Sequence, residues 1–316
     1  MNQGLVTAFR PHFVRASTVR GVLAIGLALG ASSVCMAEEK VLDRTFTVAP
    51  GGLLTVNADA ADVSVSGGNS SQVVVHMVAR GSQKELDELK FSAAQGDGGV
   101  TVELLQQQRG GWFNWGTWHG DAHIEVTVPR NYRVEAKTSG GDVKLEDVAG
   151  PSRLRTSGGG IEARNVKGGI EGHTSGGDVR LESIEGVIVA RTSGGSVHVA
   201  SVRGDIDAST SGGDVRLLGV DGKISAKTSG GSVQCELVGA NRGISASTSG
   251  GDVRLTMPKD TPGTLDAEAN GGDITSDLPI ATTHWGEHRL SGLINGGGNA
   301  IYVRTSGGGI ALNAAR

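Results

Sequence analysis

Apolar and polar residues alternate in short runs along most of this chain, and the runs recur at a fixed interval. In one period Val179 and Leu181 stand two residues apart, and Ile170 stands four residues before Thr174. A spacing of two and many β-branched side chains are typical of β-strands, and no long stretch has helical spacing. The pattern is anchored by a phrase of the form Thr-Ser-Gly-Gly-Asp-Val. Its copies begin at Thr138, Thr156, Thr174, Thr192, Thr210, Thr228, Thr248 and Thr305.

The first six copies are 18 residues apart, and self-similarity at a fixed period is the signature of a solenoid. Each period predicts a short Val-x-Leu strand after the phrase and a longer Ile-x-Ala-x-Thr strand before it. Ser-Gly-Gly makes the corner between them, because glycine adopts positive φ without steric penalty. Parallel strands stacked about 4.8 Å apart would give one rung per period. We therefore predict an all-β fold, a parallel β-solenoid with 18 residues per regular rung.

Residues 38–135 are β-rich but out of register with the repeat, so we expect them to cap the first rung and cover its strand edge. With the repeat solenoid, residues 136–316, they are expected to form one continuous domain. Ser82–Leu89 predicts one or two helical turns, and a degenerate copy of the phrase begins at Ala269. The predicted strands before the repeats are Val41–Val48, Leu53–Asn57, Asp62–Val65, Val73–Val78, Val100–Leu104 and Ile124–Val128.

Positions expected to point outward carry alternating charge. Four residues after each threonine, Asp alternates with Gly or Ser, and a rung with Asp has Lys or Arg two residues further on, as in Asp178 and Arg180. Like charges opposite each other on neighbouring strands destabilise a sheet, so we interpret the alternation as structural spacing of charge. The threonine shares the parity of the inward residues, so its hydroxyl is expected to bond the glycine corner from inside.

Residues 1–37 have the features of a secretory signal peptide. An apolar run at 21–34 follows several arginines, and Cys35-Met36-Ala37 offers small residues at the −3 and −1 positions. The run is too short for a membrane span, so we expect a chain that begins near Glu38, lacks a transmembrane span and is exported to the periplasm or the cell surface. A lipidated Cys35 is the alternative. Cys235 falls in an inward column and is expected to be a buried packing residue.

Composition narrows the function classes. A net charge of −4 and the lack of a basic run argue against a nucleic-acid partner. The string His284-x-x-Glu287-His288 matches an inverted zincin motif, but Gly286 and the missing helical period make it a chance match. A second metal candidate is the alternating run His119, Asp121 and His123. Polar residues at the start of a strand are the more common reason for such a run, so no metal or cofactor is predicted.

The candidate binding residues are aromatic, and no catalytic residue is predicted. Three of the four tryptophans lie within seven residues, together with a phenylalanine, between glycines that indicate a loop. Two interpretations stay open: a hydrophobic plug over a solenoid end, or a contact loop for a sugar, lipid or protein, since clustered exposed apolar surface usually marks a partner. The residues are Trp112, Phe113, Trp115 and Trp118.

Three sequence features carry a resemblance to a known family. They are the Thr-Ser-Gly-Gly-Asp-Val-x-Leu repeats, the segment Leu54-x-Val-x-Ala-x-x-Ala-Asp-Val-x-Val, and the closing Ile-Asn-Gly-Gly-Gly followed by Thr-Ser-Gly-Gly-Gly-Ile. Residues 41–316 resemble the bacterial β-strand-repeat family of unknown function named for proposed adhesins, which is similar to head-GIN and toast-rack domains. The resemblance implies an exported β-solenoid, with adhesion or envelope-stress roles proposed for relatives, and supplies no catalytic residues.

We therefore expect an exported, non-catalytic β-solenoid that serves as a structural or binding, adhesin-like module at the bacterial cell envelope. A surface glycan, an envelope component or a protein would be its partner, and the sequence does not determine its oligomeric state. One alternative is an envelope-stress component that acts through a membrane-protein partner. A carbohydrate-active β-helix enzyme is a further alternative, but it needs clustered carboxylates, basic residues or a metal, and the acids here are dispersed.

Overall fold

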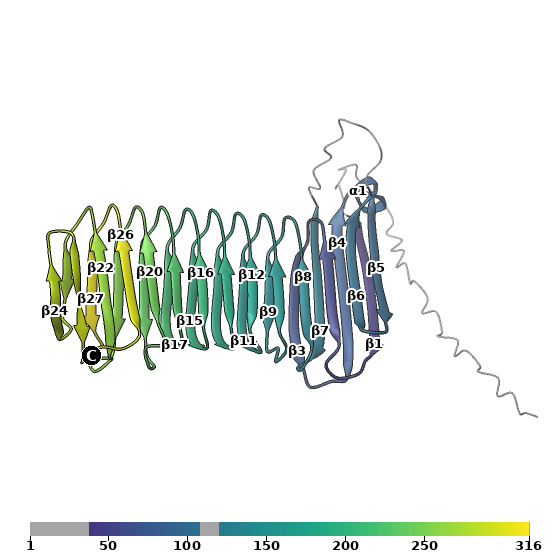
Figure 1. The fold of residues 1–316 in the computed structure, drawn as a ribbon. Coiled ribbons are helices and arrows are strands. Elements are labelled where there is room, and N and C mark those ends of the chain that lie inside the picture. Colours follow the sequence, from purple (N-terminus) through teal and green to yellow (C-terminus); the bar gives the residue numbers. More distant parts are fainter. Residues whose placement is uncertain (1–37, 108–119, 316) are drawn as a thin grey trace, which may run out of the picture. The chain divides into compact units, whose positions relative to one another are not determined.

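A computed structural model describes residues 38–107 and 120–315, and residues 37–316 form one compact unit. Their strands form two facing sheets, joined alternately by two corners (Figure 1). The predicted all-β fold with stacked parallel rungs is confirmed. We define sheet A by its strands in spatial order: β1 (Glu38–Thr47), β4 (Gln72–Gly81), β7 (Asp121–Pro129), β3 (Asp62–Gly68), β9 (Val143–Glu146), β11 (Ile161–Lys167), β13 (Val179–Glu185), β15 (Val197–Arg203), β17 (Val215–Asp221), β19 (Val233–Leu237), β21 (Val253–Met257), β27 (Ile310–Ala314) and β23 (Ile274–Ser276).

Sheet B runs opposite sheet A along the same stack. Its strands in spatial order are β24 (Ile280–Trp285), β25 (Arg289–Ile294), β22 (Gly263–Ala269), β26 (Ala300–Thr305), β20 (Ile244–Thr248), β18 (Ile224–Lys227), β16 (Ile206–Ser209), β14 (Ile188–Arg191), β12 (Ile170–His173), β10 (Ser152–Arg155), β8 (Arg133–Lys137), β2 (Leu53–Ala58), β6 (Gly99–Gln106) and β5 (Leu89–Gly96). A rung is one sheet-B strand, the Thr-Ser-Gly-Gly corner (the first corner), and the following sheet-A strand. A second corner leads to the next rung.

The core lies between the sheets and consists of the inward columns that the period predicts. Val179, Leu181, Ile184 and Ile188 are all buried, with exposed fractions of 2% or less, as expected for one rung. From β11 to β17 in sheet A, neighbouring rungs pair in parallel without a shift, and Val179 stands beside Val197. In sheet B, Ile188 stands beside Ile206. The register of sheet A shifts between β17 and β19, near Leu217 and Val220. Each inward side chain therefore packs on its equivalents above and below.

The relative lengths of the two strands were predicted the wrong way round. The Val-x-Leu strand is the longer one, seven residues in β13, whereas β12 and β14 have four. The reason is a left-handed residue nine positions after the threonine, for example Ser183 with φ 58°. It rotates the chain locally, as a β-bulge does, so that residues ten positions after the threonine, such as Ile184, turn inward and pairing continues to the second corner.

The threonine column bonds the first corner from inside, as predicted. The Thr174 hydroxyl donates to the carbonyl oxygen of Gly159 in the preceding rung, 2.7 Å away, and accepts from the N–H of Gly177 in its own corner at 3.4 Å. Its side chain is buried. The donor bond recurs at 2.7–2.9 Å for every copy of the phrase.

Antiparallel strands close the N-terminal end of both sheets. In sheet A, β4 pairs antiparallel with β7 and β1 with β4; in sheet B, β5 pairs antiparallel with β6. The helical turn predicted within Ser82–Leu89 is α1 (Gln83–Asp87), and Glu85 Oε2 accepts the N–H of Ser82 at 2.9 Å. All six strands predicted in this part are present. Strand β5 was not predicted, because its sequence has no clear alternation.

At the C-terminal end, the order of rungs in space departs from their order in sequence. The last rung, β26 and β27, lies between the Thr248 rung and the degenerate rung of β22 and β23 (Figure 1). Strand β26 pairs in parallel with both β20 and β22. Strands β25 and β24 then add antiparallel to sheet B beyond β22.

Candidate functional site

The aromatic residues predicted to bind a partner, Trp112, Phe113, Trp115 and Trp118, lie outside the described residues. The described residues on either side are Gln107 and Gly120, next to the ends of β6 and β7. Strands β6 and β7 belong to opposite sheets.

Neither of the two candidate metal motifs from the sequence forms a metal site in the described parts of the chain. His119 lies outside these residues, and His123 contacts Asp121 at 3.0 Å and Asp62 at 3.5 Å. His284 lies on β24, and Glu287 precedes β25, so the zincin string has no helix. Within residues 38–107 and 120–315, no three His, Cys, Asp or Glu side chains converge in a way that could hold a metal ion.

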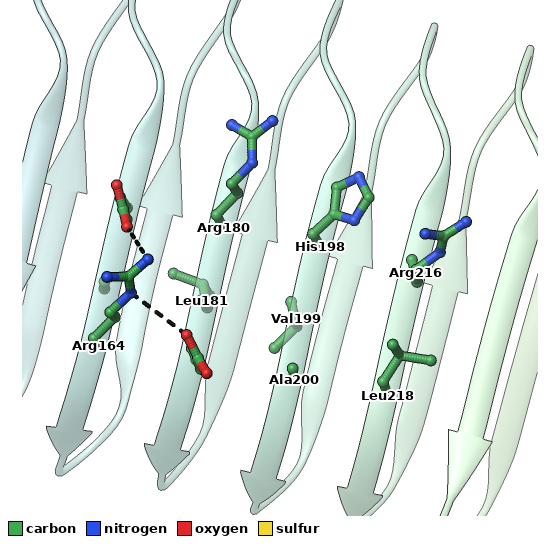
Figure 2. A pocket seen from close by; sticks show the side chains of 11 residues that line it. Arg164, Arg180, Leu181, His198, Val199, Ala200, Arg216 and Leu218 are labelled. Carbon is green, nitrogen blue, oxygen red and sulfur yellow. Dashed lines mark ion pairs between the residues drawn. The ribbon is translucent and has the colours of Figure 1, made fainter.

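A groove of about 310 Å³ lies on the outer face of sheet A, over β11, β13, β15 and β17. Arg180, His198 and Arg216 stand side by side on three neighbouring strands and form one wall (Figure 2). They occupy the outward position six residues after each threonine. Ala200 and Leu218, two residues further along their strands, add apolar surface. The small side chain of Ala200, next to Glu182 of β13, makes room for the depression.

Arg164 closes the groove on the β11 side and neutralises its carboxylates. Its guanidinium contacts Glu162 at 2.7 Å and Glu182 at 3.4 Å (Figure 2). Arg180 contacts Asp178 at 2.6 Å. Arg216, in contrast, makes no ion pair with any residue that the structure describes. The groove therefore presents an arginine whose charge is not neutralised by direct contact.

His198 stands between the two arginines and is only partly exposed. Burial lowers its pKa from the ordinary value, and the charges of Arg216 and Arg180 lower it further. Asp178 and Asp214 act in the opposite direction. The balance favours the neutral imidazole, and an anion placed in the groove would reverse this preference.

The aspartates at the first corner are bound to the backbone. Asp178 accepts the N–H of Ser196 in the next rung at 2.8 Å, and this bond, before the Arg180 charge, lowers the pKa of its carboxyl. Asp142 and Asp214 accept the equivalent N–H of Gly160 and Ser232 at 2.7 and 2.8 Å. These bonds support a structural role for the alternating aspartates, since each holds two neighbouring corners together.

The outer face of sheet B around β10 and β12 has a different electrostatic character, because the charges there pair with one another. Glu171 contacts Arg153 at 2.8 Å, Arg155 at 2.9 Å and His173 at 3.1 Å. The hydrogen bonds from Arg153 and Arg155 lower the pKa of Glu171 to about 2. A depression of about 310 Å³ beside this cluster also includes Val187 and Val189. Arg153 in this depression pairs with Glu135 and Glu171, and Arg133 makes no ion pair with a described residue. The sheet-A groove aligns three basic side chains on neighbouring strands, so it is the better candidate for a charged ligand.

Residues 53–313 match the Toastrack DUF4097 family. The chain belongs to this family. No curated protein matches it. Among solved structures, it is similar to a "putative adhesin" from Bacteroides fragilis, with 12% identity over 87% of this chain and 97% of that chain and a TM-score of 0.42. It is also similar to a "putative cell adhesion protein" from Clostridium sporogenes, with 12% identity, coverage of 89% and 100% and a TM-score of 0.24.

A third similar structure is a "putative lipid binding protein" from Parabacteroides distasonis, with 10% identity, coverage of 87% and 97% and a TM-score of 0.39. Similarity of this degree carries no argument about a ligand. In the part of this toastrack chain that the structure describes, no helix has the length and apolar character needed to cross a membrane.

The sequence pattern identified the outward row of charged residues that lines the groove, but it did not predict the groove itself. Arg180, His198 and Arg216 belong to the outward row whose alternation was interpreted as structural. What makes this part of the row different is the side chain two residues further on, which is Glu in β13 and Ala in β15. A comparison, rung by rung, of the outward positions six and eight residues after each threonine would have identified Ala200 as the exception.

Proposed function

We propose that this toastrack protein is an exported, non-catalytic binding module with an adhesin-like role at the bacterial cell envelope. The observation that carries the proposal is the groove on sheet A, where Arg216 has no ionic partner among the described residues and Arg180 and His198 flank an apolar surface. Ligand sites combine apolar surface with a few placed polar groups in this way. The repeats stack on a continuous core, which supplies a rigid support for such a surface.

The carboxylates of the groove support a binding role over catalysis. Glu162 and Glu182 are both held by Arg164. A glycosidase needs two carboxyl groups on opposite sides of a reacting bond, one of them free to give up a proton. Two carboxylates that are both engaged by one arginine serve this chemistry poorly. Export to the envelope rests on the signal-like features of residues 1–37.

Two experiments test the proposed function. In the native bacterium, a C-terminally tagged chain should fractionate with the periplasm or cell surface, with an N-terminus near Glu38. The purified chain from Glu38 should cosediment with isolated envelope but not with washed ribosomes, a control particle rich in anionic surface. A tagged protein found inside the cell with residues 1–37 intact, or cosedimentation that envelope and ribosomes share equally, would contradict the proposal.

A further inference from the structure

We propose that the sheet-A groove binds a linear acidic glycan that lies across the strands, parallel to the stacking direction of the rungs. This inference rests on the proposed binding function and names the chemical class of the ligand. Two features of the groove support it. One wall has three basic side chains, Arg180, His198 and Arg216, and the apolar surface of Ala200 and Leu218 lies below them.

The register of the strands sets the direction and spacing of the ligand contacts. Arg180 pairs in register with His198, and His198 with Arg216, so the three side chains form a straight row across β13, β15 and β17 (Figure 2). Two strand spacings separate the arginines, or about 9.6 Å. A ligand that meets both arginines must carry negative groups at repeated intervals along an extended chain.

The donors available in this row suit carboxylates. A guanidinium offers five N–H donors in a planar fork that binds a carboxylate through two parallel hydrogen bonds. Arg180 uses one nitrogen on Asp178, which leaves further donors for a ligand, and Arg216 has no ionic partner in the described part of the chain. The methyl and isobutyl groups of Ala200 and Leu218 offer contact to the C–H surface of a sugar ring.

Three other anionic partners fit the surface less well. A nucleic acid needs a broad basic patch or large aromatic side chains for stacking, whereas the chain carries a net charge of −4 and the groove has no Trp, Tyr or Phe among its lining residues. A flat anionic membrane would also meet Asp178 and Asp214, which border the basic row. These two carboxylates would repel the membrane surface. An acidic peptide would gain no backbone hydrogen bonds, because the strands under the groove pair on both sides.

Proton uptake by His198 should accompany binding. The charged groups that face its imidazole are Arg180 and Asp178 on the β13 side and Arg216 and Asp214 on the β17 side. The two arginines and burial disfavour its protonation in the free protein, and a bound anion would favour it. Affinity should therefore rise as pH falls, over a range in which a carboxyl group with a pKa of about 4 stays ionised.

The test measures binding of hexagalacturonate by isothermal titration calorimetry, with neutral maltohexaose and poly-L-glutamate as comparison ligands. The chain from Glu38 should bind hexagalacturonate, and bind it several-fold more tightly at pH 5.5 than at pH 8. The double variant Arg180→Ala, Arg216→Ala should bind about a hundredfold more weakly, about tenfold for each charged hydrogen-bonding group. His198→Gln should remove the pH dependence.

The matched control is the double variant Lys144→Ala, Arg254→Ala. It removes the same charge from the same outward row, outside the groove, and should keep wild-type affinity. Wild-type protein that ignores hexagalacturonate, or equal losses in both double variants, would overturn the inference. Tighter binding of poly-L-glutamate, lost in the groove variant, would overturn the glycan class in favour of an acidic polypeptide.

The envelope cosedimentation separates this inference from the proposed function. If the Arg180→Ala, Arg216→Ala variant still cosediments with envelope while hexagalacturonate binding is absent from the wild type, the binding function stands and the groove is not its site. If neither ligand nor envelope binds, the proposed function itself fails.

Discussion

The regular rungs between Thr138 and Thr248 and the last fifty residues of the chain use the same corner phrase but differ in order. In the regular part, each rung stacks on the one that precedes it in sequence. Near the C-terminus, the rung that begins at Thr305 instead stacks on the Thr248 rung, and the earlier Ala269 rung is displaced outward. The phrase therefore specifies the geometry of a rung, and something else specifies its place in the stack.

One hydroxyl distinguishes the two rungs that could stack on the Thr248 rung. Seven of the eight threonines donate to a glycine carbonyl of the rung on which they stack, and Thr138 donates to the carbonyl of Ala61. Thr305 donates to Gly251 at 2.7 Å. Alanine at position 269 has no hydroxyl, so a rung built on it would leave the Gly251 carbonyl without this donor. The bond to the Gly251 carbonyl is part-buried, and a part-buried acceptor that loses its donor costs stability. The threonine rung takes the interior place, and the alanine rung lies beyond it.

Deletion of residues 300–315 should have the largest effect, because it removes an interior rung. Four buried side chains are lost: Ile301, Val303, Ile310 and Leu312. Each is worth about 1.5–3 kcal/mol on burial, so the free energy of unfolding should fall by several kcal/mol. Urea denaturation measures the loss. Hydrogen exchange should also accelerate over 263–294, which loses its neighbour.

The control for this deletion is a Gly-Ser linker of equal length in place of 280–285. Strand β24 is the outermost strand of sheet B, and five of its six residues are exposed. Its replacement should cost much less stability. If the linker variant lost as much stability as the deletion, the interior position of β26 and β27 would not be what stabilises this end.

Thr174→Val should come next, with a loss of about 1–3 kcal/mol, because it leaves the half-buried Gly159 carbonyl without its donor at unchanged side-chain shape. Thr305→Val tests the comparison directly. Its hydrogen bond has the same length, so the loss should be similar although the rung is out of sequence order. Ser175→Ala, on the exposed neighbour, should have almost no effect on the urea midpoint. A Thr305→Val protein as stable as wild type would refute the account of rung order.

The interval of 18 residues was sufficient to predict the fold, because burial repeats with the sequence. Parity alone placed Val179, Leu181 and Ile188 inside, and it placed the threonine hydroxyl beside the glycine corner. It did not predict the left-handed conformation at Ser183, because Asp, Asn, Ser and Gly share that position and no single residue type marks it. The order of the rungs in space was not predicted either. The repeat defines each rung, but it does not show which of two rungs stacks on a third.

The candidate site was harder to predict than the fold. A groove depends on how far neighbouring side chains reach, so the difference between Glu182 and Ala200 decides its shape. Periodicity records whether a residue points outward but not how deep the surface becomes. The aromatic segment raises a separate question: whether Trp115 plugs an end of the solenoid or contacts a partner stays a prediction to test.

Acid should reveal the paired charges of sheet B. The pKa of Glu171 is lowered to about 2, first by its hydrogen bond from Arg153 and then by that from Arg155. A carboxyl group whose pKa is lowered by folding adds to the free energy of unfolding. This contribution is fully present above the unfolded-state pKa of about 4.5 and is lost as the pH falls toward 2. Because the cluster is partly exposed, we expect about 1 kcal/mol.

Urea denaturation at pH 5 and pH 2.5 measures this contribution. Glu171→Gln should lower stability at pH 5 and lose less of it between the two pH values than wild type. Glu182→Gln is the control, since it removes an exposed carboxylate with one longer contact of 3.4 Å to Arg164. Equal acid sensitivity of the Glu171→Gln protein and wild type would mean that the solvent already screens the cluster.

The smallest expected effect concerns the alternation of aspartates in sheet A, and it returns to the difference between regular and irregular rungs. Ser196 lies between Asp178 and Asp214 in consecutive corners, and its hydroxyl accepts the N–H of Asp214 at 3.2 Å. Ser196→Asp would keep an acceptor at this place but set three carboxylates on successive rungs. Each unfavourable pair costs about 0.2–1 kcal/mol. Part of this cost is offset by the backbone bond, so the net loss should be about 0.5 kcal/mol at low salt and should shrink as salt screens the charges.

Ser196→Asn, which has nearly the same shape without the charge, should not show this salt dependence. If the Asp and Asn variants were equally stable at low salt, charge would not be the reason for the alternation, and the aspartates would alternate only because of the bonds they make to the next corner.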